Sequence, residues 1–252
     1  MKIISWNVNG LKSVLRKNFL NWIENSKAEI VCLQEIKMQL NEMKNILFKP
    51  KDFLFYFNSR KRKGIWGVAV FTKEKPLEIK QKLEIERFDD EGRFLELKYP
   101  QFSLINFYAP HGGRQKENLS YKLEVYKKFL EYLEKIKNEN LILAGDFNIA
   151  HKKIDLARPK ENKNNTMFTL KEREQIDRII KLGFVDSFRK FHKEGGNYTW
   201  WPYSFNARER NLGWRIDYIF ISKSLASKLK NAFILKEIKA SDHSPIGIKI
   251  SI

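Results

Sequence analysis

Short apolar runs rich in β-branched and aromatic residues recur along the chain and predict β-strands. Polar or turn-forming residues separate these runs, and none of them approaches the ~18 apolar residues that a membrane span needs. Nine strands are predicted, at residues 3–8, 29–34, 53–57, 67–72, 94–99, 102–108, 140–145, 214–222 and 245–252. Because nine strands exceed the usual size of one sheet, we expect two sheets packed on each other.

Apolar residues with helical spacing predict three helices, at residues 15–25, 117–137 and 170–182. The third helix has the clearest ends. Thr169 precedes it and Glu172 follows three residues later, which is the pattern of a capping box. Gly183 comes directly after the last apolar position, where a left-handed residue commonly ends a helix. Strands interspersed with helices in this way indicate a mixed α/β fold.

The 252-residue chain has no repeats, low-complexity blocks or Pro/Gly/Ser linkers, so we expect a single domain over residues 1–252. Hydrophobic residues make up 42% of the chain and aromatic residues 13%, which is enough for a packed interior. The opening sequence MKIISWNV passes directly into a strand-like run without the features of an export signal. We therefore expect a soluble, cytoplasmic protein that makes no contact with a membrane.

The chain is strongly basic, with a formal net charge of +18. Such a charge attracts polyanions over long range and favours the release of their counterions. The alternative interpretation is a general bias toward lysine, since most of the basic residues are lysines. Nucleic acid is nevertheless the first partner to consider.

Polar residues that are unusual in strands follow directly on several apolar runs, namely Asn7, Glu35, Tyr108, Asp146 and Asn148. If these strands end at the same edge of the fold, their side chains gather on one rim. For an acid such as Glu35 or Asp146 taken alone, a solvated loop residue or a helix cap is the better explanation. The set as a whole predicts a functional site.

Four carboxylates near the ends of the runs supply the oxygen ligands that a hard cation prefers, namely Glu35, Asp146, Asp217 and Asp242. The only cysteine, Cys32, lies in the apolar run IVCL, so neither an internal disulfide nor a thiolate cluster can form. We therefore predict a site for Mg²⁺, with Mn²⁺ as the alternative.

Five motifs occur in order: SWNVNGL (5–11), LQEIK (33–37), GDFNIAH (145–151), WRIDY (214–218) and SDHSPI (241–246). Together they resemble the exonuclease III and AP endonuclease family of the endonuclease/exonuclease/phosphatase superfamily, over nearly the whole chain. Finer matches, FDDEGR (88–93), YAP (108–110), IDLARPKENKNN (154–165) and YTWW (198–201), resemble the abasic-endonuclease branch. The resemblance implies a four-layer α/β sandwich, with two packed mixed β-sheets flanked by helices and the active site at one end.

The resemblance also implies catalytic roles for five matched residues. Asp146 would orient or deprotonate the attacking water, and Asn148 would hold water and phosphate. His243, paired with Asp217, would donate to a phosphoryl oxygen. Tyr108 would lie against the scissile phosphate or the leaving 3′ oxygen.

The metal would be held by Glu35 as the principal carboxylate, with Asn7 and Asp242 beside it. Water would attack phosphorus in line, with Lewis-acid stabilisation of the growing charge. The implied reaction cuts the phosphodiester bond 5′ to an abasic site in duplex DNA and leaves a 3′-hydroxyl and a 5′-deoxyribose phosphate.

Apolar residues matching the pocket for a flipped abasic sugar in this family are Trp200, Trp214 and Ile216, and such a pocket rejects intact bases by size. Basic and amide residues matching its DNA-backbone contacts are Arg114, Lys116, Asn162, Asn164 and Asn165. Arg208 and Arg210 are further candidates for such contacts. The expected partner is duplex DNA with abasic sites or blocked 3′ ends, bound by a monomer.

Three positions depart from the family pattern. Asn9 stands where some members have Asp, and His111 stands where Asn is frequent. Met167 stands near the pocket where small residues are common, so its flexible thioether could narrow the pocket. The alternative is therefore an enzyme that works mainly on 3′ ends, as exonuclease or phosphatase, with weak incision at abasic sites. A lipid phosphodiesterase and an inactive nucleic-acid-binding module are more distant alternatives.

Overall fold

The computed structural model of the protein describes residues 1–38, 42, 50–59 and 66–252. Two six-stranded sheets dominate it, and each contains both parallel and antiparallel pairs. The first sheet has the order β11 (Leu229–Ile234), β12 (Ile246–Ile250), β1 (Lys2–Asn7), β2 (Ile30–Gln34), β4 (Val68–Thr72) and β3 (Leu54–Asn58). The second has the order β5 (Glu78–Lys80), β6 (Phe94–Lys98), β7 (Ser103–Tyr108), β8 (Leu141–Asp146), β10 (Asp217–Ser222) and β9 (Phe184–Asp186). The predicted pair of packed mixed sheets is confirmed.

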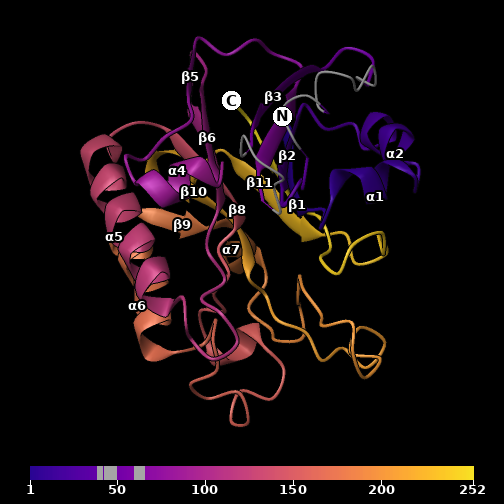
Figure 1. Ribbon diagram of the computed structural model, residues 1–252. Helices are drawn as coiled ribbons and strands as arrows, with labels where there is room; N and C mark the ends of the chain where they lie inside the picture. The colour runs from indigo at the N-terminus through magenta and orange to yellow at the C-terminus, as the bar shows by residue number, and fades with distance from the viewer. Residues whose placement is uncertain (39–41, 43–49, 60–65) are drawn as a thin grey trace.

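The helices and 3₁₀ turns lie between these strands in the chain. They are α1 (Leu11–Leu15), α2 (Phe19–Asn25), α4 (Glu86–Asp90), α5 (Leu119–Ile136), η1 (Lys153–Asp155), α6 (Leu170–Lys181), α7 (Ser187–Phe191) and η2 (Lys223–Leu225). Helices α5 and α6 flank the second sheet, and α1 and α2 flank the first (Figure 1).

Three apolar cores separate the four layers, because successive strand residues face opposite sides of a sheet. In β1, Ile3 faces the core between the two sheets, whereas Ile4 and Trp6 face the core beneath α1 and α2. In β7, Phe107 packs on Phe129 of α5 with their rings stacked 4.1 Å apart. The four-layer α/β sandwich expected from the resemblance is present.

The prediction of one continuous helix at 15–25 was wrong. The chain forms α1 and α2 instead, because Asn18 between them has a left-handed backbone (φ 65°) that no α-helix can continue through. Helix α6 begins after Thr169, whose hydroxyl accepts from the Glu172 amide in a capping box, and Gly183 follows with φ 95°. Both predicted ends of that helix are confirmed.

The strand predicted at 214–222 begins only at Asp217. Trp214 instead forms isolated bridges with Leu156 and Trp200, so this part of the chain leaves the sheet to form a wall beside it. The strands β5, β9 and β11 and the short helices α4 and α7 were not predicted. Among the described helices, none combines the length and apolar character that crossing a membrane requires.

Candidate active site

The polar residues that end the strands meet at one end of the sandwich, the lower end in Figure 1. β1 runs parallel to β2 and β7 runs parallel to β8, so the carboxyl ends of each pair lie side by side. β10 runs antiparallel to β8 and starts with Asp217 opposite Asp146. His243 comes just before β12, which starts where β1 ends. The topology thus brings distant segments of the sequence to one rim.

Gly145 allows β7 and β8 to approach closely just before the rim. A Cβ atom at this position would lie 1.9 Å from the carbonyl oxygen of Phe107, a distance that no side chain can occupy. The glycine in the GDF motif therefore fixes where Asp146 emerges from the sheet.

Asn7 joins two carboxylates at the centre of the site. Its side-chain nitrogen donates to Glu35 Oε2 at 3.1 Å and to Asp146 Oδ2 at 3.0 Å. The Tyr108 hydroxyl donates to the same Glu35 oxygen at 2.9 Å, and Lys37 Nζ lies 2.8 Å from Glu35 Oε1. Burial, followed by the Glu35 carboxylate, raises the pKa of Tyr108 well above its ordinary value, so the phenol remains a hydrogen-bond donor.

His243 and Asp217 form a buried pair. His243 Nδ1 lies 2.9 Å from Asp217 Oδ2, and the Thr199 hydroxyl donates to that oxygen at 2.6 Å. Burial works against the imidazolium, but the Asp217 carboxylate outweighs burial and raises the pKa of His243 to about 10. The ring therefore carries a proton on both nitrogens at neutral pH, which leaves Nε2 as a second donor.

Asp146 accepts hydrogen bonds from neutral amides, including that of Asn7 and the backbone of Asn148, which donates to Oδ1 at 2.8 Å. Its side chain is only 1% exposed. Burial, followed by the Asp217 carboxylate, raises the pKa of Asp146 to about 7. A carboxylate that gains a proton this readily suits the role of proton acceptor.

Asp242 is held by donors from separate segments. Asn9 Nδ2 donates to its Oδ1 at 2.9 Å, and the indole nitrogen of Trp200 donates to its Oδ2 at 3.1 Å. Burial opposes ionisation, but neighbouring His243 and these donors prevail, so the pKa of Asp242 is lowered. Asp242 is thus a carboxylate at neutral pH, and it is tied directly to the aromatic side of the site.

Several of these groups could hold a cation. Asp146, Asp217 and His243 each offer a ligand atom, and the three atoms lie within 4.8 Å of one another. The predicted ligands Glu35 and Asp242 border the same pocket as Asp146 and His243. Carboxylate oxygens dominate this donor set, so it fits a hard divalent cation.

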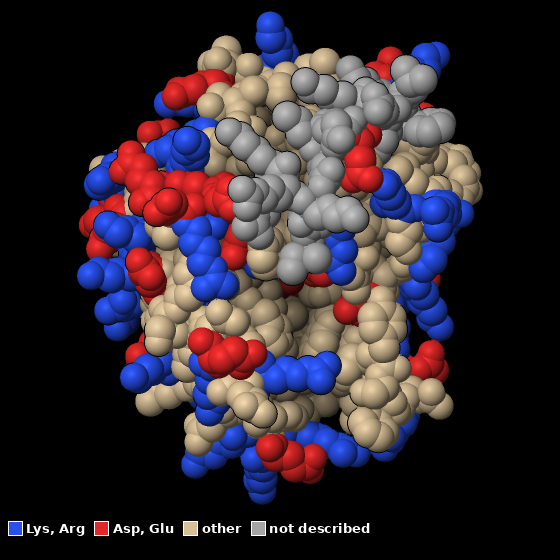
Figure 2. Space-filling model, viewed as in Figure 1, with Lys and Arg blue, Asp and Glu red and all other residues tan. Residues whose placement is uncertain are grey.

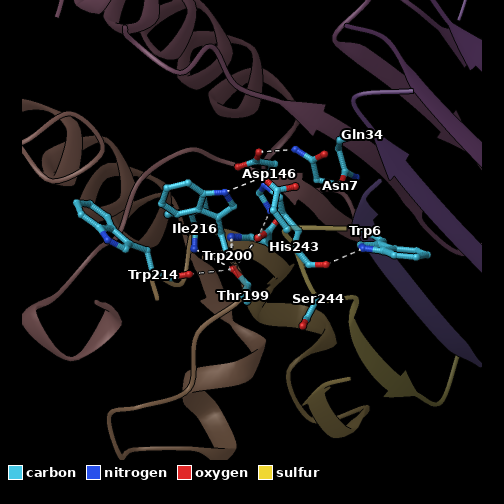
Figure 3. Close-up of polar contacts among 12 residues, drawn as sticks. Trp6, Asn7, Gln34, Asp146, Thr199, Trp200, Trp214, Ile216, His243 and Ser244 are labelled. Carbon is cyan, nitrogen blue, oxygen red and sulfur yellow. Dashed lines mark hydrogen bonds and ion pairs between the residues drawn. The ribbon is translucent and has the colours of Figure 1, made fainter. Parts of the chain in front are cut away.

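A pocket of about 250 Å³ opens beside these groups. Tyr108 and Asn148 contribute to its polar side, and Trp200, Ile216 and Met167 contribute to its apolar side. Figure 3 shows Trp200 between His243 and Trp214, whose ring lies edge-on to that of Trp200 at 6.5 Å. Of the three apolar residues predicted for the pocket, Trp200 and Ile216 line it, whereas Trp214 packs with them and lines the adjoining cleft.

The pocket continues into a wider cleft of about 740 Å³, and Figure 2 shows a hollow on this face with basic side chains below it. Arg114, Asn162 and Asn165, which were predicted to contact DNA, line the cleft. Lys116 and Asn164 are exposed on the neighbouring loops. Arg208 is instead committed internally, because its guanidinium donates to the carbonyl oxygens of Ser241 and Ile238 and to two further acceptors.

Other residues near the site were missed by the sequence reasoning. Tyr203 and Phe205 follow the YTWW motif and are 78% and 82% exposed, and Tyr203 lines the cleft. Lys122 in α5 is fully buried at 0%. The burial of Lys122 could have been predicted from its position four residues before Tyr126, on the apolar stripe of the helix.

Comparison with known proteins gives a consistent result. Residues 4–243 match the Endonuclease/Exonuclease/phosphatase family. An exodeoxyribonuclease of Bacillus subtilis is 41% identical over 255 residues, which is 100% of both chains. An AP endonuclease from Archaeoglobus fulgidus has a similar structure (TM-score 0.92, 30% identity, 100% of both chains). So does a 3′ phosphatase from Neisseria bound to a product DNA hairpin (TM-score 0.92, 27% identity, 100% of both chains).

Proposed function

Because the chain belongs to the exonuclease III/AP endonuclease family of the endonuclease/exonuclease/phosphatase superfamily, we propose that its main reaction is incision of duplex DNA 5′ to abasic sites. It is a phosphodiesterase of the AP endonuclease/exodeoxyribonuclease III type and a DNA repair nuclease, which sets aside the lipid phosphodiesterase and the inactive binding module. The proposed products are a 3′-hydroxyl and a 5′-deoxyribose phosphate. Removal of 3′ blocks and 3′ to 5′ exonuclease activity are proposed as secondary reactions of the same site.

One observation carries this proposal: the small pocket has an apolar side and a polar side within the same space. Trp200 and Ile216 offer a surface for a sugar that lacks its base, while Asp146 and His243 line the same pocket. We propose that the apolar side selects a flipped deoxyribose that has lost its base. The adjoining cleft gives the duplex a place to lie, with Arg114 available to its backbone.

The proposed division of work follows from the hydrogen bonds and charges of the site. Asp146, with its pKa raised to about 7, orients the attacking water and accepts its proton. Protonated His243 donates from Nε2 to a phosphoryl oxygen, and Asp217 keeps the imidazolium in place. Asn148 and Tyr108 offer further donors to the phosphate and to the leaving 3′ oxygen.

The carboxylates that border the pocket fit a divalent cation, with Glu35, Asp242 and Asn7 proposed as the residues that hold Mg²⁺ or Mn²⁺. A cation held there would supply Lewis-acid stabilisation of the charge that develops on the phosphate. Asn7 is suited to position this set, because its amide bridges Glu35 and Asp146. Lys37 and Tyr108 fix the two oxygens of Glu35 from the other side.

Duplex DNA is the proposed substrate, consistent with the net charge of +18 and with the structurally similar Neisseria 3′ phosphatase that was solved with a DNA hairpin. We propose that the protein acts on it as a monomer.

Met167 supports the second candidate, an enzyme that acts mainly on 3′ ends. Its side chain lines the apolar side of the pocket and is packed with Trp214 and Ile216. Its backbone is left-handed (φ 72°), a conformation that a non-glycine residue adopts at a cost. A side chain held there reduces the room for an abasic sugar inside a continuous strand.

The experiment compares kcat/KM on two labelled duplexes, one with a central tetrahydrofuran analogue of an abasic site and one with a nick ending in a 3′-phosphate. We expect faster incision at the analogue. Faster removal of the 3′-phosphate would assign the protein to the second candidate. The variant Met167→Gly, which suits the left-handed backbone, identifies the cause, since it should raise incision only if the thioether restricts the pocket.

A further inference from the structure

A lysine and a glutamate form a fully buried ion pair behind the site. Lys122 of α5 and Glu172 of α6 are both 0% exposed, with Nζ 2.7 Å from Oε1. Burial lowers the pKa of Lys122, although Glu172 opposes this shift. Removing two charges from water is costly, and well-packed apolar residues often stabilise a core as well or better. A contribution to stability is therefore a weak explanation for the pair.

The ammonium group of Lys122 binds the loops that follow β7 and β8. It donates to the carbonyl oxygen of Asn148 at 2.6 Å and to that of His111 at 3.3 Å. Asn148 has a left-handed backbone (φ 51°), and its side-chain amide donates to the carbonyl oxygen of Ala109 at 2.9 Å. Lys122 thus fixes the backbone carbonyl of a residue that lines the pocket.

The carboxylate of Glu172 binds a second segment that lines the pocket. Oε1 accepts from the amide of Met167 at 3.0 Å, and Oε2 accepts from the amide and hydroxyl of Thr169 at 3.0 and 2.6 Å. The carbonyl oxygen of Met167 in turn accepts from the amide of Ala150 at 2.8 Å. The capping box at the start of α6 therefore also fixes the second left-handed residue that lines the pocket.

We propose that Lys122 and Glu172 are a positioning pair that sets the distance between the Asn148 amide and the pocket wall at Met167. Each partner holds one wall, and the ion pair joins the walls through contacts that an apolar pair could not make. Neither residue touches the reacting atoms. The inference rests on the proposed function in one respect: it assumes that the substrate binds between Asn148 and Met167.

The main test is the double variant Lys122→Met/Glu172→Gln, which removes both charges and leaves no unpaired ion in the core. Per folded molecule, and well below the unfolding temperature, we expect kcat on the tetrahydrofuran duplex to fall about tenfold to a hundredfold, as expected for small misplacements of catalytic groups. KM should change less than about threefold, because the two substitutions leave in place Arg114, Asn162 and Asn165, which line the cleft and are proposed to contact the DNA backbone. Glu172→Gln alone is measured beside it, in case the double variant does not fold.

The matched control is Lys128→Met, which breaks the exposed Lys128–Glu131 pair on the same helix and should leave kcat and KM unchanged. Both the tetrahydrofuran duplex and the 3′-phosphate nick are used. If the wild type acts only on the nick, the proposed main reaction fails while the pair is still tested there. A lower unfolding temperature with unchanged kcat and KM would overturn the positioning role and leave the pair as part of the scaffold.

Discussion

Two buried carboxylates, Asp146 and Asp155, differ in the groups that surround them. Asp146 is bonded to amides, and burial together with Asp217 raises its pKa to about 7. Asp155 lies 2.7 Å from Arg215 Nε and 2.5 Å from Arg189 Nη2, and these guanidinium groups outweigh burial and lower its pKa. Asp155, which two arginines neutralise, is therefore part of the scaffold, whereas Asp146, which no lysine or arginine contacts among the described residues, is available for chemistry.

The largest expected effect comes from Asp146→Asn, which keeps the shape of the side chain and removes the proton acceptor. We expect kcat on the tetrahydrofuran duplex to fall by at least about 10³-fold. The unfolding free energy of the variant should not fall below that of the wild type. The folded pKa of Asp146 is raised, so its charge disfavours folding as the pH rises toward about 7. Urea unfolding at pH 8 in EDTA should give the variant equal or greater stability than the wild type, and a large loss would contradict this.

Asp155→Asn should behave in the opposite way. It leaves Arg215, which is 1% exposed, without one of its two carboxylate partners. Breaking a buried pair in this manner costs about 3–5 kcal/mol of unfolding free energy. The kcat of the folded fraction should change less than about threefold. If kcat fell as far as in Asp146→Asn while the unfolding free energy in urea stayed unchanged, the proposed contrast between Asp146 and Asp155 would be wrong.

The same residue gives a pH prediction. Since the folded pKa of Asp155 is lowered, its contribution to stability is present above the unfolded value of about 3.9 and is lost as the pH falls through the folded pKa. The stability difference between wild type and Asp155→Asn should therefore shrink steadily between about pH 5 and pH 2. Urea unfolding across this range measures it, and a constant difference would show that the lost ion pairs are not the cause.

Trp200→Phe sharpens the comparison inside the active site. A phenyl ring keeps the pocket wall but loses the indole donor to Asp242. Loss of about 1 kcal/mol for this hydrogen bond corresponds to a fall in kcat/KM of about fivefold. The control is Trp201→Phe, which loses a bond to Asn211 outside the pocket and should leave kcat/KM unchanged. An equal fall in kcat/KM in both variants would show that the hydrogen bond from Trp200 to Asp242 has no particular role in activity.

Arg114→Ala should have the smallest effect and act only on binding. Each phosphate contact on duplex DNA contributes about −0.9 to the slope of log affinity against log salt concentration. Removing Arg114, which lines the cleft, should make the slope shallower by about one unit, while the maximal rate on saturating DNA is kept. Fluorescence anisotropy at several salt concentrations measures it, and an unchanged slope would place Arg114 outside the DNA footprint.

The sheets and the polar rim of the site could be predicted from the sequence, because polar residues directly end the apolar runs. Asn7, Glu35 and Asp146 are examples. Helix α6 was predicted almost to the residue, since both its capping box and its terminal glycine are local signals. The left-handed backbone of Asn18 separates α1 from α2. The pattern of hydrophobic residues does not indicate such a backbone conformation.

The remaining misses depend on tertiary contacts. Lys122 was assigned no role because lysine is ordinarily exposed, and only the distant Glu172 explains its burial. Trp214 was placed in a strand by its apolar neighbours, although its backbone pairs with Trp200 across the pocket wall. Short strands such as β9, with three residues, are too brief for a pattern of alternation to appear.

The central claim is metal-dependent incision beside an abasic site, and one measurement tests it most directly. A duplex with a single central tetrahydrofuran analogue is incubated with wild type or Asp146→Asn, in Mg²⁺ or in EDTA, and the product ends are identified. The account predicts cleavage 5′ to the analogue, with a 3′-hydroxyl end, only for wild type in Mg²⁺. Equal cleavage in EDTA, or by Asp146→Asn, would contradict it.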